Sequence, residues 1–245
     1  MTGSPLSRAR APRRRPRWRS TCVDAGVAQL KRSIFYLRPN LFFVFDYVAK
    51  QREQHQVKPQ LNFHFPEKPG ISKTNRELTV TNGRGRLDMI SVFPAESITR
   101  IRANKDSGAL VSGWHFTVTD ANEGALHQRY LHVFRAEDSR SRLSFPNYGA
   151  ITGSGVHGVW IEDPGFEQGA RRVAVVFSDD GAAAQPRGLE YERTDVDRHY
   201  ILNLTPAKNY TLTKSGISGR NTIHIRENSS GEVRSSSTGV LVFSR

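Results

Sequence analysis

Two side chains on neighbouring segments of this chain are of the types that ligate metal ions. Asp46 ends an apolar, aromatic segment, and His64 lies in the next segment of alternating polar and apolar residues. Carboxylate oxygen and imidazole nitrogen are both common ligands of Zn²⁺. The sequence therefore leaves two interpretations open: a zinc site at Asp46 and His64, or a turn acceptor at Asp46 and a hydrogen-bonded sheet residue at His64.

A second group of side chains has the chemistry needed to bind carboxylated sugars. Guanidinium groups pair with carboxylates through two parallel hydrogen bonds, and arginines recur at Arg84, Arg86, Arg100 and Arg102. Trp114 offers an aromatic face on which a sugar ring can stack. The alternative interpretations are a solvated strand face for the arginines and a core position for the tryptophan.

Other reaction chemistries are not predicted. Residues 83–86 and 153–155 are glycine-rich, but neither segment opens a helix or contains the Lys-Ser/Thr of a phosphate-binding loop, so both are predicted to be β-turns. No G-x-S-x-G motif occurs, and the serine-rich residues 229–237 lack the strand–turn–helix setting of a serine nucleophile. The single cysteine, Cys22, excludes an internal disulfide.

The elements that must position these side chains are β-strands. Residues 31–37 and 41–48 are apolar, aromatic and β-branched, and the turn residues 38–40 separate them, which predicts a hairpin. In the next strand Asn62 and His64 share one face, because side chains alternate along a strand. Further short segments follow, closed by Gly, Asn, Asp or Pro, without a helical stripe. The pattern predicts an all-β fold, a large antiparallel β-sandwich of two sheets.

The charge is concentrated at the N-terminus. The chain carries a net charge of +13, a surplus that is typical of proteins with a polyanionic partner. Seven of its arginines lie in residues 1–22, which contain no acidic residue. Residues 1–28 are predicted to be a disordered tail rich in Arg and Pro, and residues 29–245 the folded domain.

Several partner classes and targeting signals are not expected from the sequence. The basic tail is not followed by an apolar core, so no signal peptide is predicted. The longest apolar run is only strand-sized, so neither a membrane-spanning helix nor a membrane partner is expected. The body of the chain has no helix-turn-helix, zinc-finger or RNP-type pattern, so specific nucleic-acid binding is not expected.

Several segments together resemble the C-terminal β-sandwich region of heparinase II/III-like polysaccharide lyases and their alginate-lyase relatives. Residues 32–46 are similar to that family's strand pair ending in an Asp, and residues 113–118 and 129–135 to another recurrent pair. Residues 204–210 are similar to its late hairpin. The resemblance covers about residues 29–245.

The resemblance implies that the chain is the non-catalytic β-sandwich portion of a lyase acting on uronic-acid polysaccharides by β-elimination. In that family an α/α-toroid supplies the Tyr, His and Asn or Glu groups that abstract the C5 proton, and this chain has no toroid sequence. The implied partners are an acidic polysaccharide and a toroid domain on another chain. Exported relatives imply a periplasmic or extracellular location.

Family members hold a structural zinc with two His and one Asp. No histidine precedes Asp46, so the site formed by Asp46 and His64 is expected to be incomplete. The alternative function is a stand-alone module that binds acidic polysaccharide, with Trp114, Arg84 and Arg86 as contacts. Catalysis by this chain alone is left open, and a Tyr–His pair in one of its own clefts would favour it.

Overall fold

The computed structural model describes residues 26–51, 58–104, 113–141, 145–162, 171–179, 188–193, 195–217 and 220–244. All regular elements within these ranges are β-strands, which confirms the predicted fold class. The predicted tail, residues 1–28, lies almost entirely outside the described residues, as does Cys22. No helix in the described ranges is long and apolar enough to span a bilayer.

The strands form three sheets. The six-stranded sheet contains, in spatial order, β1 (Val27–Leu37), β2 (Leu41–Lys50), β9 (His127–Asp138), β6 (Gly85–Phe93), β5 (Glu77–Asn82) and β4 (Gly70–Ile71). The nine-stranded sheet contains β17 (Val233–Arg234), β15 (Asn209–Ile217), β16 (Arg220–Glu227), β13 (Leu189–Arg193), β10 (Asn147–Ser154), β11 (Val156–Glu162), β12 (Arg172–Ser178), β14 (Arg198–Leu202) and β18 (Leu241–Ser244). The three-stranded sheet contains β3 (Gln60–Phe65), β8 (Gly113–Asp120) and β7 (Ser97–Asn104).

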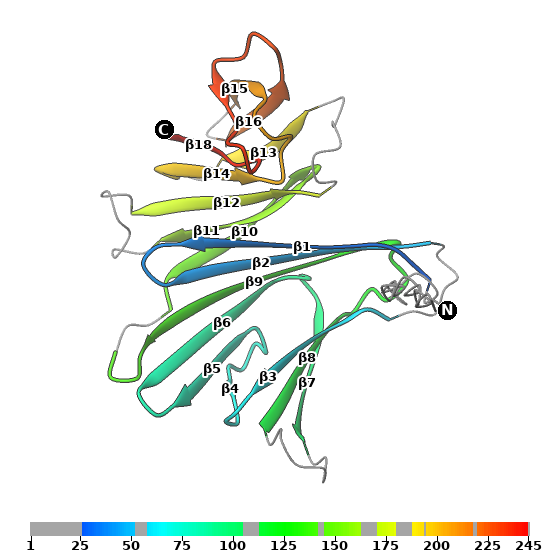
Figure 1. Cartoon of the computed structure of the whole chain (residues 1–245), viewed down its shortest axis with the longest axis vertical. Coiled ribbons are helices and arrows are strands. Elements are labelled where there is room, and N and C mark those ends of the chain that lie inside the picture. The colour runs from blue at the N-terminus through cyan, green and yellow to red at the C-terminus, as the bar shows by residue number, and fades with distance from the viewer. Residues whose placement is uncertain are drawn as a thin grey trace, which may run out of the picture.

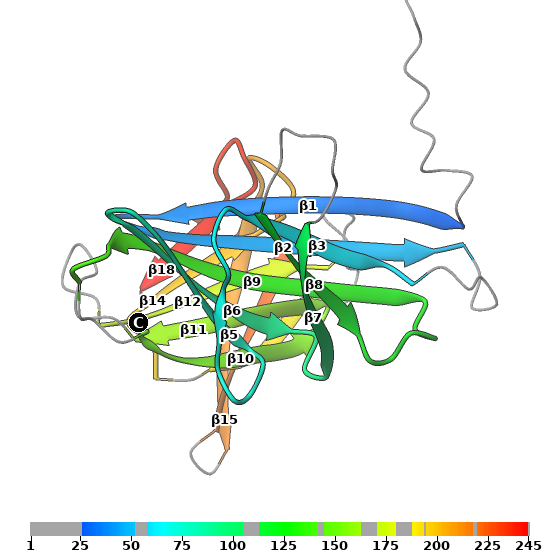
Figure 2. The same ribbon diagram turned by 90° about the horizontal axis from the view of Figure 1, so that it is seen from below.

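The six-stranded sheet is packed on both of its faces (Figures 1 and 2). One face meets the nine-stranded sheet, where Phe45 stacks on Phe177 with ring centroids 4.9 Å apart. The opposite face meets the three-stranded sheet, where Met89 and Tyr130 share a buried cluster with Phe116. The predicted sandwich is therefore confirmed for the two large sheets, and the structure adds a third sheet to its outer side.

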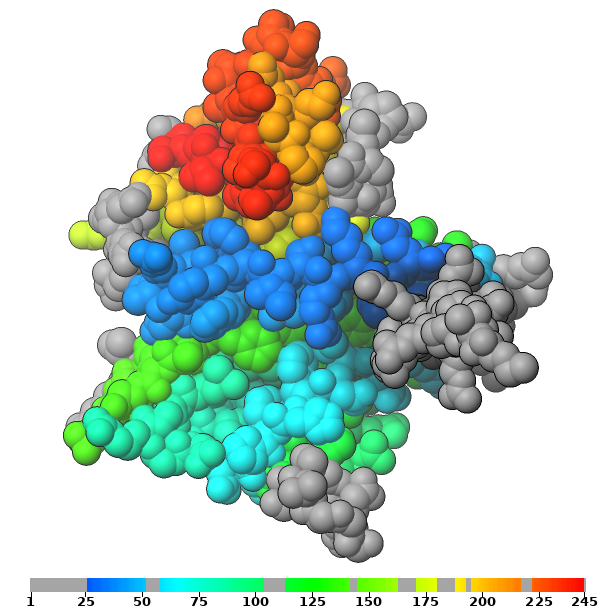
Figure 3. Space-filling view, viewed as in Figure 1, coloured from blue at the N-terminus to red at the C-terminus, as the bar shows by residue number. Residues whose placement is uncertain are grey.

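A third apolar cluster lies within the nine-stranded sheet. Ile201 of β14, Tyr191 of β13 and Ile223 of β16 are buried together in it, although these strands belong to one sheet. In Figure 3 the N-terminal strands cross the middle of the molecule, and the C-terminal strands gather at the upper end. The upper end therefore has its own core, separate from the layer beneath it.

The predicted hairpin is present as β1 and β2, and its burial follows the alternation of the sequence. Leu41, Phe43 and Phe45 point into the core with the nine-stranded sheet, whereas Phe42 between them is 37% exposed. This is the pattern expected when one side of a strand faces a packed layer and the other faces solvent or a smaller sheet. The strand period therefore decides which face of β2 is buried.

Four strands, β4, β7, β10 and β17, were not predicted from the sequence. Glycine breaks the apolar pattern of β10, but Gly153 is required there because a Cβ would lie only 1.8 Å from the backbone oxygen of Glu190 in β13. Close approach of a neighbouring backbone is a recognised reason for glycine inside a strand. The predicted turn at residues 153–155 is confirmed, because Gly155 has a φ of 71° between β10 and β11.

Candidate functional site

The outward face of the three-stranded sheet carries a grid of polar side chains. Inward residues such as Phe116 and Ile101 pack against the six-stranded sheet, so their neighbours in sequence point the other way. We call this outward surface the imidazole–arginine face, and it consists of Asn62, His64, Arg100, Arg102, His115 and Thr117.

Strand pairing sets these side chains in two rows across the sheet. His64 lies opposite His115, which in turn lies opposite Arg102. Two residues along, Asn62, Thr117 and Arg100 form the second row in the same order. Directly paired residues in an antiparallel sheet have neighbouring side chains on one face. Each row thus presents an amide or imidazole, a central polar group and a guanidinium.

Short contacts join the side chains of β3 and β8 on this face. The imidazoles of His64 and His115 meet edge to face, with ring centroids 4.0 Å apart. The hydroxyl of Thr117 donates a hydrogen bond of 2.8 Å to Oδ1 of Asn62. The Nε2 atom of His115 is buried without a hydrogen-bond partner among the described residues. Buried polar atoms are usually paired, so this nitrogen is an exception on the face.

The face is cationic. Arg100 and Arg102 are both exposed, and neither has a carboxylate partner in the described ranges. Neither row contains an acidic residue. Free guanidinium groups on a flat sheet can each form a forked pair of hydrogen bonds with a carboxylate or sulfate, beside amide, hydroxyl and imidazole groups that hydrogen-bond to hydroxyls.

The structure places Trp114 on the side of β8 opposite to His115. The ammonium group of Lys68 lies 5.3 Å from the centre of the Trp114 ring. At that distance a cation–π contact forms. The indole is partly buried. Its burial therefore does not decide between the two interpretations, a core residue and a surface on which a sugar ring stacks.

Arg84 and Arg86 lie at the β5–β6 turn of the six-stranded sheet, away from Trp114 on the three-stranded sheet. Arg84 is highly exposed and lies 3.7 Å from Asp138. Arg86 is held against Asp88 at 3.0 Å. The structure therefore does not gather Arg84, Arg86 and Trp114 on one surface.

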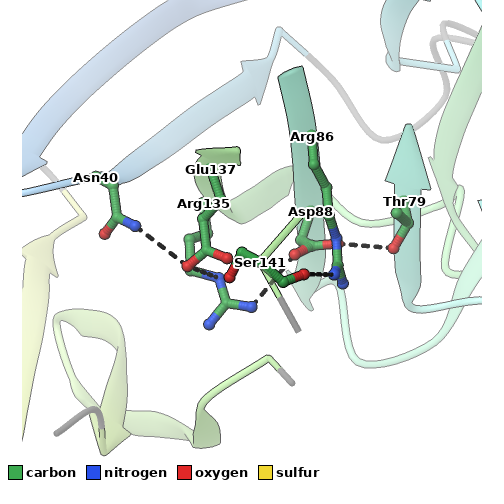
Figure 4. Close-up of polar contacts among 7 residues, drawn as sticks. All are labelled: Asn40, Thr79, Arg86, Asp88, Arg135, Glu137 and Ser141. Carbon is green, nitrogen blue, oxygen red and sulfur yellow. Dashed lines mark hydrogen bonds and ion pairs between the residues drawn. The ribbon is translucent and has the colours of Figure 1, made fainter. Parts of the chain in front are cut away.

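Arg86 is part of a buried charge network (Figure 4). Asp88 accepts hydrogen bonds from Arg86 and Thr79, and also lies 3.3 Å from Nη2 of Arg135. Arg135 is 2% exposed and contacts Glu137 at 3.2 Å. Each buried charge has an opposite charge beside it, as burial in a medium of low dielectric requires. These contacts give Arg86 a structural role.

The predicted zinc ligands do not form a site that fits Zn²⁺. Both carboxylate oxygens of Asp46 are bonded by Arg32, at 2.6 Å from Nε and 3.1 Å from Nη2. This contact raises the pKa of Arg32, because the hydrogen bond favours its charged form. Asp46 faces the inner side of the three-stranded sheet, whereas His64 lies on its outer side. No group of three His, Cys, Asp or Glu suited to a metal ion occurs among the described residues.

A recess of about 350 Å³ is lined by residues of β9, by residues at and between β6 and β7 and β8 and β9, and by His157 of the nine-stranded sheet. His127, Arg129 and His157 are among its lining residues. The hydroxyl of Tyr47 lies 2.8 Å from Nδ1 of His127, and its ring lies under the guanidinium of Arg129. The sequence did not single out this Tyr–His pair, because the two residues lie 80 positions apart.

Asp179 connects the six-stranded and nine-stranded sheets through its contacts with Arg129 and His157. Its carboxylate accepts a 2.8 Å hydrogen bond from Nε of Arg129 on β9 and lies 2.8 Å from Nδ1 of His157 on β11. An ionised carboxylate only accepts hydrogen bonds, so Nδ1 of His157 is the donor in this contact. Burial raises the pKa of Asp120, which also lines the recess.

Comparison with known proteins finds a distant structural likeness. No family model and no curated protein sequence matches this chain. One similar solved structure is a mutant of the heparan sulfate lyase HepC from Pedobacter heparinus, with a TM-score of 0.41 and 13% sequence identity. The likeness covers 54% of this chain and 22% of that chain.

Proposed function

We propose that this chain binds acidic polysaccharide on the imidazole–arginine face. The observation that carries the proposal is the pair of exposed guanidiniums, Arg100 and Arg102, one row apart on a face without carboxylates. Adjacent arginines on one strand face are separated by about 7 Å, which suits successive acidic groups on an extended chain better than a single small anion.

The same property is needed by both functions that the sequence resemblance suggests. A non-catalytic β-sandwich portion of a heparinase II/III-like lyase would hold the uronic-acid chain for a toroid domain on another polypeptide. A stand-alone module would hold the chain by itself. In either case the arginines bind the acidic groups, and Asn62 and the two imidazoles hydrogen-bond to the hydroxyls. The buried Thr117 holds Asn62 in place through its hydrogen bond.

Binding measurements on charge-matched variants test this proposal. The Arg100→Ala/Arg102→Ala double variant should raise the Kd for heparin or alginate at least about tenfold, or about 1.4 kcal/mol, in titration calorimetry. The control is Arg84→Ala/Arg140→Ala, which removes the same charge from exposed positions elsewhere. Equal losses in the two double variants would show that only net charge matters and would overturn the proposal.

The Arg-rich N-terminal segment requires a second control. Deletion of residues 1–22 removes seven arginines, and affinity that survives the deletion must come from the remaining chain. Binding that disappears with these residues would reflect non-specific attraction of polyanions, which added salt screens strongly. The proposal expects residual binding that still depends on Arg100 and Arg102.

A second candidate function, elimination catalysed by this chain alone, is favoured by the recess that His127 and His157 line. Each of these imidazoles contacts a buried side chain, Tyr47 or Asp179, and both pairs are of the types that donate and accept protons. An ultraviolet assay for unsaturated uronate on heparin, heparan sulfate and alginate tests it. Turnover that is lost in Tyr47→Phe and His157→Gln would establish this function, and its absence from the folded chain would exclude it.

A further inference from the structure

The upper end of the molecule carries a second group of reactive side chains, on the outer face of three adjacent strands. Glu190 of β13 is paired with His224 of β16, and His224 is paired with Thr213 of β15. The neighbours Tyr191 and Ile223 are buried in the core on the other side. Glu190, His224 and Thr213 therefore all face outward, and Ser215 joins them two residues along β15.

The distances place a serine, an imidazole and a carboxylate in one relay. The hydroxyl oxygen of Ser215 lies 3.0 Å from Nε2 of His224. The other ring nitrogen of His224, Nδ1, lies 3.4 Å from Oε2 of Glu190. Because a carboxylate is an acceptor, it favours the proton on Nδ1 and leaves the lone pair of Nε2 directed at the serine hydroxyl. This is the order of roles in a nucleophile, base and orienting acid.

Ser215 and His224 line an open recess of about 580 Å³ on the same face, and Glu190 is not among its lining residues. Thr211, Thr213, Arg226, Glu227 and Asn228 also line it. All of these side chains are polar, and Arg226 and Thr213 carry donors of the kind that stabilise the negative oxygen formed when a hydroxyl attacks an ester carbonyl. A recess lined by hydroxyl, amide and guanidinium groups suits an acyl group carried on a polar, hydroxylated compound better than a lipid ester.

We propose that Ser215, His224 and Glu190 catalyse hydrolysis of O-acyl esters of polar, hydroxyl-bearing compounds. Ser215 Oγ bonds to the acyl carbon as His224 Nε2 takes the hydroxyl proton. The imidazolium returns this proton to the departing alkoxide, the ester C–O bond breaks, and the alcohol leaves. Water then attacks the acyl-serine, His224 takes one of its protons and gives it to Ser215 Oγ, and a carboxylic acid is released. Water is the only co-reactant, and Glu190 orients the imidazole throughout.

Sequence motifs do not reveal this relay. Serine nucleophiles are recognised in sequence by a sharp strand-to-helix turn, and Ser215 lies instead in a strand. Glu190, Ser215 and His224 come from three separate strands, so only their pairing brings them together. The relay is independent of the polysaccharide proposal, because it lies on a different sheet from Arg100 and Arg102.

Covalent labelling of the full chain tests the proposal. A fluorophosphonate probe should label Ser215, as located by peptide mass spectrometry, and the chain should hydrolyse p-nitrophenyl acetate. Ser215→Ala should lose the label and lower the hydrolysis rate at least about tenfold, and His224→Gln should lower both similarly. Ser244→Ala, which changes an exposed serine on β18 of the same sheet, should retain both activities.

The labelling and hydrolysis assays do not depend on polysaccharide binding. A label that persists in Ser215→Ala, or equal hydrolysis by the wild-type chain and Ser215→Ala, overturns the relay. Circular dichroism establishes that each variant retains its strand content, and Glu190→Gln provides a second test that keeps the side-chain volume. A hydrolysis rate unchanged in Glu190→Gln would exclude the carboxylate from the relay.

Discussion

The rings of His64 and His115 meet edge to face at 4.0 Å, because β3 and β8 pair these two residues directly. His115 is also the residue that brings Arg102 into the same row. A pair of imidazoles beside a free guanidinium supplies hydrogen bonds in several directions, which a chain of sugar hydroxyls requires. The strand register is therefore what assembles the imidazole–arginine face.

The first prediction concerns this pair. Either His64→Ala or His115→Ala should weaken binding of alginate or heparin about threefold to tenfold, since a net hydrogen bond contributes about 0.5–1.5 kcal/mol. Titration calorimetry measures the change. His224→Ala, which removes an imidazole from the nine-stranded sheet, should leave the Kd unchanged. Equal losses in all three variants would contradict a role for this face.

The second prediction is a pH dependence of stability caused by His132. The side chain is fully buried, and among the described residues its one hydrogen-bond partner is Ser91, at 3.2 Å; burial lowers the pKa of His132 to about 3. In the unfolded chain its pKa returns to about 6.5, so between these values the unfolded state binds a proton that the folded state does not. The free energy of unfolding should therefore fall by up to about 1.4 kcal/mol per pH unit below pH 6.5.

Urea denaturation at a series of pH values measures that slope. His132→Gln removes the titrating group, so its free energy of unfolding should depend less steeply on pH between about 6 and 4. The comparison uses the slope, not the absolute stability, because the substitution also changes core packing. Identical slopes in the two proteins would rule out His132 as the cause.

The third prediction concerns Asp179, which joins the two large sheets through Arg129 and His157. Asp179→Ala leaves a partly buried guanidinium without its counter-charge and should lower the free energy of unfolding by about 2–4 kcal/mol. Arg84→Ala breaks the exposed contact with Asp138 and should cost less than about 0.5 kcal/mol. Chemical denaturation of both variants checks the difference, and comparable losses would disprove the cross-sheet role.

The fourth prediction concerns the close approach of β10 and β13. Gly153→Ala should destabilise the protein by about 1–3 kcal/mol, because the added Cβ collides with the backbone of Glu190. Gly70→Ala is the control, since its Cβ would meet nothing closer than 3.8 Å. Thermal denaturation compares the two. If Glu190 also shifts, Gly153→Ala should reduce p-nitrophenyl acetate hydrolysis as well, a result that the Gly70→Ala variant should not share.

Local features of the fold were predictable from sequence because they depend only on residues close together in the chain. Alternation gave the all-β class, the β1–β2 hairpin and the shared face of Asn62 and His64. Strand β10 escaped prediction because Gly149 and Gly153 interrupt its apolar pattern, and both are explained only by neighbours: the indole of Trp160 and the backbone of β13.

For the site residues too, the sequence predicts the chemistry of the side chains, and the tertiary structure decides which of them lie together. Residue chemistry and alternation by themselves identified arginines suited to acidic sugars and a histidine, His64, that shares a strand face with Asn62. Only the tertiary structure decided that Arg100 and Arg102 share a sheet with His64, that Arg84 and Arg86 pair with acids elsewhere, and that Asp46 is held by Arg32.

Composition and alternation thus determined that this chain forms antiparallel strands and which residues of each strand share a face. Tertiary structure decided which strands became neighbours, and so which faces received two imidazoles beside arginine or serine beside histidine and glutamate. The physical reason is that side-chain alternation is a property of a single strand. Strand order and register depend on the burial of apolar surface shared by segments far apart in the chain.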